Sequence, residues 1–182
     1  IIRFNKKQIT FFEINILNFN SEIDFDIIYA KNVFQYLDNP IEGFLKSHSL
    51  LKDSGSLICS LSAFSYYSDI DNIRKDLLKL GYSYENKEDI EESYNIVSGL
   101  NGFHPARLRM VKGDNFIDKN DFIFRFLCPI HSSFSIRDIF GLCNSSDFYF
   151  QSWYSNALYY PSSLLRKDSS RHSSLYNKIN LV

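Results

Sequence analysis

"DFDIIYAKNVFQYLDNP", residues 24–40, places a continuous apolar run directly before a helix-start signal. The run at 25–30 has the length of a strand, and an uninterrupted apolar strand is typical of a parallel sheet that is covered on both faces. Asp38 and Asn39 offer capping side chains, and Pro40 suits the first position of a helix. We therefore predict a buried strand that leads directly into a helix.

The following residues complete a strand–helix–strand pattern. Helical spacing continues after the proline through four residues, Phe44, Leu45, His48 and Leu51. "KDSG" at 52–55 is predicted to end this helix, and "SLICSLSA" at 56–63 to form a second buried strand. "QITFFEINILNF" at 8–19 predicts one further strand upstream, ending near Asn15. Strands alternating with helices favour an α/β fold with a largely parallel sheet.

The middle of the chain has mostly helical periodicity. Apolar residues predict a helix over 70–80 that stops at Gly81 and another over 87–100, whose first turn is rich in acidic residues. Residues 101–116 show no period and are expected to form a loop. A short helix is predicted at 118–127.

The carboxyl-terminal part begins with a helix signal and ends in a polar tail. "SIRD" at 135–138 has the spacing of a capping box, with Asp in place of the usual Glu. "DFYFQSW" at 147–153 alternates and predicts an edge strand. Residues 162–182 are rich in Ser and are expected to be a polar tail.

Composition excludes several classes of protein. Lys and Arg are scattered and the net charge is −1, so we expect no nucleic-acid partner. No apolar stretch reaches the roughly 18 to 20 residues of a membrane span. The odd count of three cysteines argues against a disulfide framework and favours a reducing, cytoplasmic setting. There is no serine hydrolase elbow and no phosphate-binding P-loop motif.

Ligands of open parallel sheets bind beyond the carboxyl ends of the strands. That rule selects polar or small residues after the three predicted strands: Asn15 and Ile16, then Ala30, Lys31 and Asn32, then 60–63. We expect these residues to form the rim of a ligand site.

The central block, "FDIIYAKNVFQYLDNPIEGFLKSHSLLKDSGSLICSL", resembles class I S-adenosylmethionine-dependent methyltransferases. The shared features are a strand opened by Phe-Asp, an Asp-x-Pro helix start and a buried strand after a turn, although "KDSG" departs from the usual Pro-Gly-Gly. "FHPARL" at 103–108 and the stretch from 121 to 161 are similar to a bacterial subgroup that is often joined to tetratricopeptide repeats. The resemblance covers roughly residues 8–161.

This resemblance implies a Rossmann-like methyltransferase sheet with flanking helices that lacks its first strand or strands. The family's glycine-rich turn is absent, so we expect a fragment that binds S-adenosyl-L-methionine weakly or not at all. The chain would be one partial domain: 1–63 as the remnant of the cofactor-binding core, 64–161 as a helical cover with a distal strand, and 162–182 as the tail. Tetratricopeptide repeats are a possible feature of the parent protein.

The resemblance also assigns roles to the rim. Asn15 stands where the family has an acidic residue near the adenine, although it also suits a simple turn. Ala30, Lys31 and their neighbours would contact the cofactor, unless they are only the exit of a buried strand. The ammonium group of Lys31 would meet the cofactor carboxylate or point to solvent.

Three further residues are candidates for the substrate mouth. Tyr66 follows the third predicted strand but belongs equally to an aromatic packing patch, while His104 and His131 are candidate general bases or ordinary surface histidines. Cys128 and His131 have a metal-like spacing, but too few ligands accompany them for zinc, and no metal is expected.

The sequence thus predicts methyl transfer from S-adenosyl-L-methionine to an unidentified acceptor. The sulfonium methyl is already activated, so alignment matters more than a dedicated catalytic group, and no catalytic residue is assigned. One alternative is a non-catalytic, degenerate module of the same fold, and another is a Rossmann-type binder of a different nucleotide.

Overall fold

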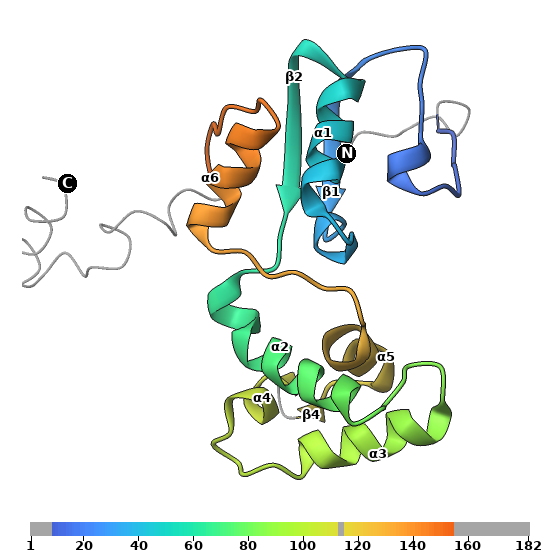
Figure 1. Ribbon diagram of the computed structural model, residues 1–182, viewed down its shortest axis with the longest axis vertical. Coiled ribbons are helices and arrows are strands. Elements are labelled where there is room, and N and C mark those ends of the chain that lie inside the picture. Colours follow the sequence, from blue (N-terminus) through green and yellow to red (C-terminus); the bar gives the residue numbers. More distant parts are fainter. Residues whose placement is uncertain (1–8, 113–114, 155–182) are drawn as a thin grey trace, which may run out of the picture. The chain divides into compact units, whose positions relative to one another are not determined.

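The computed structural model describes residues 9–112 and 115–154 (Figure 1). The chain divides into two compact units, Ile1–Phe148 and Tyr149–Val182. The first unit is mixed α/β, with helices and two small sheets. The second is described only over 149–154, where Phe150 and Trp153 pack with ring centroids 4.8 Å apart.

The predicted strand–helix–strand element is present. β1 (Phe25–Lys31) and β2 (Leu51–Ser60) pair in parallel, with Tyr29 opposite Ile58, and α1 (Pro40–Leu50) connects them. The Asn39 side chain accepts a hydrogen bond from the backbone N–H of Ile41, and Pro40 occupies the first helical turn. Because cap, proline and apolar run are all local signals, the sequence alone was sufficient to predict this element.

One face of this sheet is covered and the other is not. On the covered face, Ala30 of β1 forms a buried cluster with Phe34 and Phe44 of the connection to β2, and partly buried residues of β2 and of α6 (Ile136–Ser145) pack against this cluster. The opposite face exposes large apolar side chains, which are Ile27 (62%), Tyr29 (68%) and Ile58 (41%). Parallel sheets are normally covered on both faces, so this bare face is the unusual feature of the fold.

Helices make up most of the chain between the sheet and α6. They are α2 (Phe64–Lys79), α3 (Lys87–Ser98), α4 (Pro105–Leu108), α5 (Lys119–Phe122) and the π-helix η4 (Ile123–Leu127). Their shared core includes Ile70, Val97, Met110, Phe122 and Phe126, each with no exposed surface. The predicted apolar face of α3 and the acidic residues in its first turn are confirmed.

The capping box before α6 is also confirmed. The Ser135 side chain accepts from the backbone N–H of Asp138, and the Asp138 carboxylate accepts from the backbone N–H of Ser135. The Ser135 hydroxyl also donates to the Asp138 carboxylate, and this bond together with the one from the Ser135 N–H lowers the pKa of Asp138 because both stabilise its charged form. Asp therefore serves here in the place of the usual Glu.

Two predicted strands are absent. From Ile9 to Asn15 the chain forms no strand, and it continues into the 3-10 helix η2 (Ile16–Asn18). The stretch at 147–153 forms no strand either, although its side chains alternate in polarity. Strand formation needs a partner backbone, which a local pattern of side chains does not specify.

Two boundaries also differ from the prediction. "KDSG" does not separate helix from strand, because α1 ends at Leu50 and β2 begins at Leu51, but the pairing of β2 with β1 shifts register across these residues. The expected loop at 101–116 contains α4 and two short antiparallel strands, β3 (Val111–Lys112) and β4 (Asn115–Phe116). Elements of two to four residues are too short to produce a visible period.

Candidate functional site

The carboxyl ends of β1 and β2 form a small rigid rim. The Asn32 backbone N–H donates to Ser60 O (3.2 Å) and Ser60 Oγ (3.0 Å), and Ser60 Oγ donates to Asn32 Oδ1 (3.0 Å). Asn32 has a φ of 55°, in the left-handed region that Asn tolerates better than most residues. Of the other rim residues, Ala30 is buried (5% exposed) and Lys31 is exposed. The rim therefore offers a fixed backbone and the ammonium group of Lys31, for which the described part of the chain provides no ion-pair partner.

Asn15 and Ile16 are not part of this rim in the way the sequence predicts. Asn15 caps η2, and its side-chain oxygen accepts from Leu17 N at 2.9 Å. η2 packs against α1, where the Lys46 ammonium donates to Asn20 at 2.8 Å. The strand expected to end at Asn15 does not exist, so the observed geometry supports the turn role of this residue. Its adenine-edge role remains a prediction.

A buried polar network surrounds His131. Its Nε2 atom lies 2.9 Å from Ser62 Oγ, and its Nδ1 atom lies 3.2 Å from Asp71 Oδ1. Ser133 Oγ donates to the second oxygen of Asp71 at 2.7 Å, and Arg74 donates to the first. The side chain of His131 is 1% exposed and that of Arg74 is 4% exposed. The network joins segments that are far apart in sequence.

The charge on Asp71 is stabilised by its neighbours. Burial by itself would raise the pKa of Asp71, but contacts with His131 and Ser133 and the charge of Arg74 outweigh it. The pKa is therefore held below its ordinary value, and Asp71 is ionised at neutral pH. An ionised carboxylate in this position compensates the buried guanidinium of Arg74.

Ser62, His131 and Asp71 contact one another in the order found in serine hydrolases, but their surroundings do not suit that chemistry. A nucleophilic serine must be reachable by a substrate carbonyl and needs nearby N–H groups to stabilise the oxyanion. Ser62 is 5% exposed, and the neighbouring backbone N–H groups of Phe64 and Phe134 are already bonded to backbone carbonyls. This arrangement is therefore better explained as a structural network.

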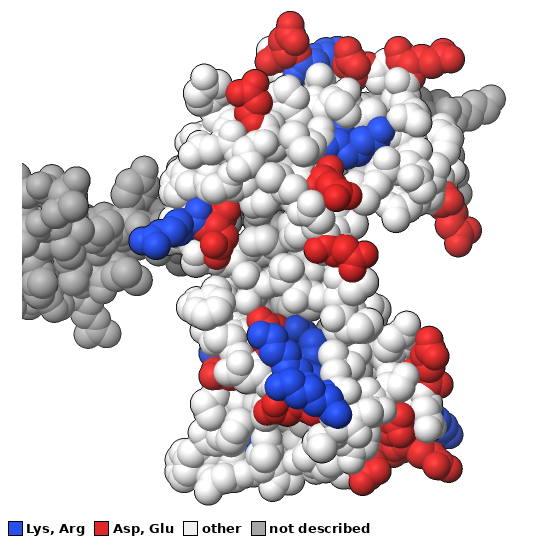
Figure 2. Space-filling view, in the orientation of Figure 1, with Lys and Arg blue, Asp and Glu red and all other residues white. Residues whose placement is uncertain are grey.

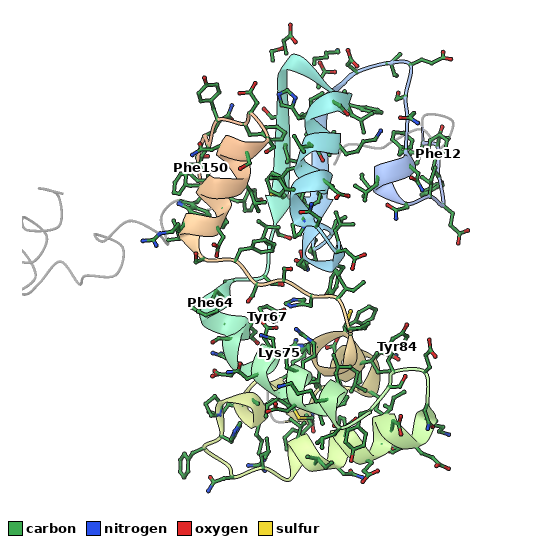
Figure 3. All side chains as sticks on the ribbon, in the orientation of Figure 1. Phe12, Phe64, Tyr67, Lys75, Tyr84 and Phe150 are labelled. Carbon is green, nitrogen blue, oxygen red and sulfur yellow. The ribbon has the colours of Figure 1, made fainter. Side chains whose placement is uncertain are left out.

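Tyr66 lies beside two arginines. The Arg109 guanidinium carbon stacks 4.1 Å from the centre of the Tyr66 ring, and Arg125 Nη1 lies 3.4 Å from the Tyr66 hydroxyl. Rings connect this site to His131, because Tyr66 and Tyr67 are 5.1 Å apart and Tyr67 and His131 are 4.9 Å apart. Figure 3 shows Tyr67 on α2. Tyr66 and His131, two of the three candidates for the substrate mouth, are thus linked through the ring of Tyr67.

His104, the third candidate, has a local structural role. It precedes α4, and its Nδ1 atom accepts from Ala106 N at 3.2 Å. No hydrogen bond or ring contact within the described ranges connects it to Tyr66 or His131. A part for His104 in substrate binding remains a prediction.

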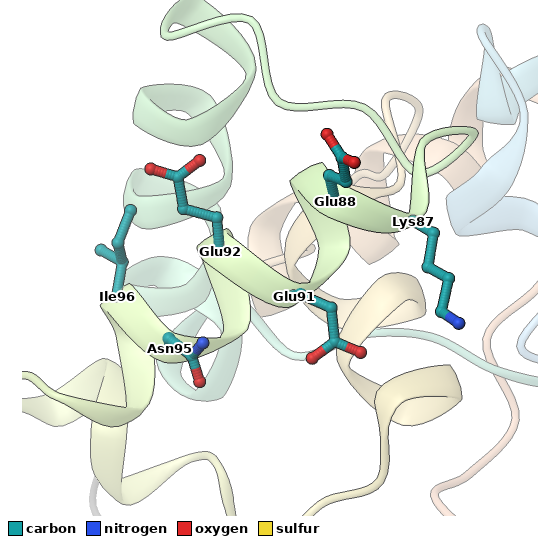
Figure 4. A pocket seen from close by; sticks show the side chains of 6 residues that line it. All are labelled: Lys87, Glu88, Glu91, Glu92, Asn95 and Ile96. Atoms are coloured by element: carbon teal, nitrogen blue, oxygen red, sulfur yellow. The ribbon is translucent and has the colours of Figure 1, made fainter.

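No other group in the described residues offers a convincing site. A shallow depression on α3 is lined by side chains of that helix alone, and Figure 4 shows them projecting from its surface. Within 9–112 and 115–154, no three His, Cys, Asp or Glu side chains converge as metal ligands, and no helix has the length and apolar character to cross a bilayer. Burial and the nearby Cys143 raise the pKa of Cys59 to about 11, so its thiol stays protonated at neutral pH.

Sequence reasoning missed the charged partners of this region, which are Asp71, Arg74, Arg109 and Arg125. One signal was available: Arg74 lies four residues after Ile70 and three before Leu77, on the buried stripe of α2. A charged residue on such a stripe indicates a buried partner. The identity of that partner is not visible in the sequence.

Comparison with known proteins adds no family to this description. No protein-family model matches the chain, and no curated protein sequence matches it.

Proposed function

We propose that this chain takes part in methyl transfer from S-adenosyl-L-methionine, with β1, α1 and β2 belonging to a Rossmann-like cofactor-binding sheet. The observation that carries the proposal is the parallel β1–β2 pair, whose carboxyl ends bring Lys31, Asn32 and Ser60 to one edge. Ligands of parallel sheets bind at that edge.

The rim fits only part of such a cofactor. Lys31 is exposed and forms no ion pair within the described residues, so its ammonium group is free to meet a carboxylate. The Asn32 N–H is already bonded to Ser60, and no acidic side chain is seen at the described strand ends to hold ribose hydroxyls. We therefore assign to this chain an edge contact with the cofactor rather than the whole site.

The chemistry divides between cofactor and protein. S-adenosyl-L-methionine supplies an activated methyl group, so the reaction needs no strong catalytic base. What this chain contributes is orientation: the locked Asn32–Ser60 pair fixes the rim, and Lys31 attracts the anionic end of the ligand. The acceptor is unidentified, and the exposed Tyr66 is its predicted neighbour, whereas the His131 side chain is only 1% exposed.

The test is an NMR titration of the 182-residue chain with S-adenosylhomocysteine. We expect saturable shifts confined to the backbone amides of 30–32 and Ser60, with a dissociation constant on the order of 1 mM. Lys31→Gln should weaken binding several-fold. Lys52→Gln is the matched control, because Lys52 lies near the start of β2 and pairs with Asp26.

Two results would count against the proposal. NAD or ATP shifting the same amides more strongly than S-adenosylhomocysteine would favour a different nucleotide ligand. Absence of any shift would favour the second candidate, a non-catalytic module of the same fold. The bare apolar face formed by Ile27, Tyr29 and Ile58 is the observation that supports this second candidate.

A further inference from the structure

Three arginines of the helical region, Arg74, Arg109 and Arg125, form what we call the arginine cluster. Arg125 Nη1 donates to Arg109 O at 3.1 Å and approaches the hydroxyl of Tyr66, the ring on which Arg109 stacks. Arg74 donates to the backbone oxygen of Arg125. Arg109 and Arg125 therefore converge on one ring, and Arg74 is joined to them through the backbone of Arg125.

The cluster carries more positive charge than its surroundings neutralise. Asp71 pairs with Arg74, but neither Arg109 nor Arg125 forms an ion pair within the described residues. Only Arg74 is paired with a carboxylate, so Arg109 and Arg125 together add two positive charges that no described ion pair compensates. Like charges held close together in a partly buried setting raise the free energy of the folded chain unless an anion compensates them.

Arg109 is also short of hydrogen-bond acceptors. Its Nε atom is buried and has no partner, while its guanidinium plane is held against Tyr66. Stacking fixes the orientation of the planar group without using its N–H donors, which then point along the plane. A guanidinium fork fixed in this way is suited to bidentate binding of an oxyanion.

Arg109 and Arg125 are accessible to solvent, whereas Arg74 is not. Arg109 and Arg125 are half-buried and Tyr66 is 37% exposed, but Arg74 is only 4% exposed. An anion from solvent can therefore reach Arg109 and Arg125 only. Arg74 acts as a positioning residue, since it holds the backbone of Arg125 and is itself held by Asp71.

We propose that the arginine cluster binds the phosphate monoester group of a small molecule, with Arg109 and Arg125 as its direct contacts and Tyr66 as their support. A phosphate monoester carries about −1.5 to −2 charges at neutral pH, which matches the excess charge of the cluster, whereas a carboxylate carries half as much. The site lies on α2, η4 and the residue after α4, not on the β1–β2 rim. It therefore does not depend on the proposed methyl transfer.

The direct test follows the side-chain Nε–Hε resonances of the arginines by NMR while inorganic phosphate is added to the whole chain. Sodium acetate and sodium chloride at matched ionic strength serve as separate arms, because screening alone also moves exposed charges. We expect phosphate to shift the Arg109 and Arg125 resonances saturably, with a dissociation constant on the order of 1 mM. Acetate should bind at least about fivefold more weakly and chloride should not saturate.

Substitutions locate the site. Arg109→Gln should weaken phosphate binding about tenfold or more, and Arg125→Lys, which keeps the charge but loses the fork, should weaken it several-fold. Lys75→Gln is the matched control. Lys75 is nine residues after Tyr66, about 180° around α2, so its loss removes one charge from the opposite face of the helix. Figure 3 labels Lys75 on α2, and Figure 2 shows basic and acidic side chains next to one another over this helix.

Three outcomes would overturn the proposal. They are no saturation by phosphate below about 50 mM, equal weakening by Lys75→Gln and Arg109→Gln, or acetate binding as tightly as phosphate. The wild-type titration decides the matter even where a variant is unstable, since it reports on the arginines themselves. A negative titration with S-adenosylhomocysteine would leave this result unchanged, so the two proposals fail separately.

Discussion

The helical region from α2 to η4 and the β1–α1–β2 region differ in how completely they cover their apolar surfaces. Among the residues that the structure describes, the helical region gathers nine buried hydrophobic residues into one cluster, whereas the sheet region gathers three. The sheet region also leaves Ile27 and Tyr29 more than half exposed. The two regions therefore make unequal contributions to the stability of the folded chain.

This difference follows from the geometry of the elements. A helix buries one stripe, and several helices can cover one another's stripes within a short length of chain. A parallel strand pair has two faces, and the connecting helix α1 lies on only one of them. A two-stranded parallel sheet thus depends on further cover, while the helical region is largely self-sufficient.

The largest effect is expected from a core residue of the helical region. Phe126 is fully buried and stacks on Phe122 at 5.0 Å, so Phe126→Ala should lower the free energy of unfolding by about 4 kcal/mol. Tyr29→Ala removes an aromatic ring of the bare sheet face, and it should cost less than about 1 kcal/mol. Chemical denaturation measures both. Similar losses would mean that the two regions do not differ in the proposed way.

The next effect concerns the charged groups of the two regions. Asp71→Asn leaves the buried guanidinium of Arg74 without its carboxylate, so it should cost about 3 kcal/mol. Asp26→Asn is the matched control, because Asp26 forms an exposed ion pair with Lys52 in the sheet region and should change stability little. Denaturation midpoints at neutral pH test this prediction.

Asp71→Asn should also change how the stability of the folded chain depends on pH. The pKa of Asp71 is lower in the folded chain than in the unfolded chain, so its stabilising contribution is complete above the unfolded pKa of about 3.9. The contribution disappears as the pH falls through the lower folded value. Asp71→Asn should therefore flatten the loss of stability below about pH 4. An unchanged acid profile would show that Asp71 does not stabilise the network through its charge.

A smaller effect is expected from two glycine substitutions, which test how tightly the covered sheet face is packed. A Cβ atom at Gly43 in α1 would lie 2.5 Å from a carbon of Phe34 and 2.6 Å from one of Leu37, so Gly43→Ala should destabilise the chain by about 2 kcal/mol. Gly141 in α6 has no atom near its Cβ position, and Gly141→Ala should stabilise by about 0.5 to 1 kcal/mol. Thermal denaturation of the two variants compares them. Stabilisation by both would indicate loose packing on this face.

The sequence was most informative where the signal is local. Asn39 and Pro40 fixed the start of α1, and Ser135 with Asp138 fixed the start of α6, because capping involves residues only two or three positions apart. The apolar run at 25–30 likewise identified β1. The stretches at 9–15 and 147–153 have strand-like composition but form no strand, because composition does not supply a neighbouring backbone with which to pair.

The candidate sites were predicted less completely. The rim at Ala30–Asn32 could be placed at a strand end, because parallel strands end at a common edge. His131 was predicted as a candidate general base or an ordinary surface histidine, whereas the structure surrounds it with Ser62, Asp71, Tyr36 and Tyr67. Those contacts span up to 95 positions of sequence separation between Tyr36 and His131, and no periodicity encodes them.

The sequence by itself determined the capped helices, the two apolar strands and their parallel order, since each depends on neighbouring residues and on chain connectivity. Only the tertiary structure decided that one sheet face is bare, that Asp71 and His131 meet, and that Arg109 and Arg125 converge on Tyr66. The physical reason is that burial, charge compensation and ring stacking depend on distances between residues far apart in the chain. Local propensity contains no information about those distances.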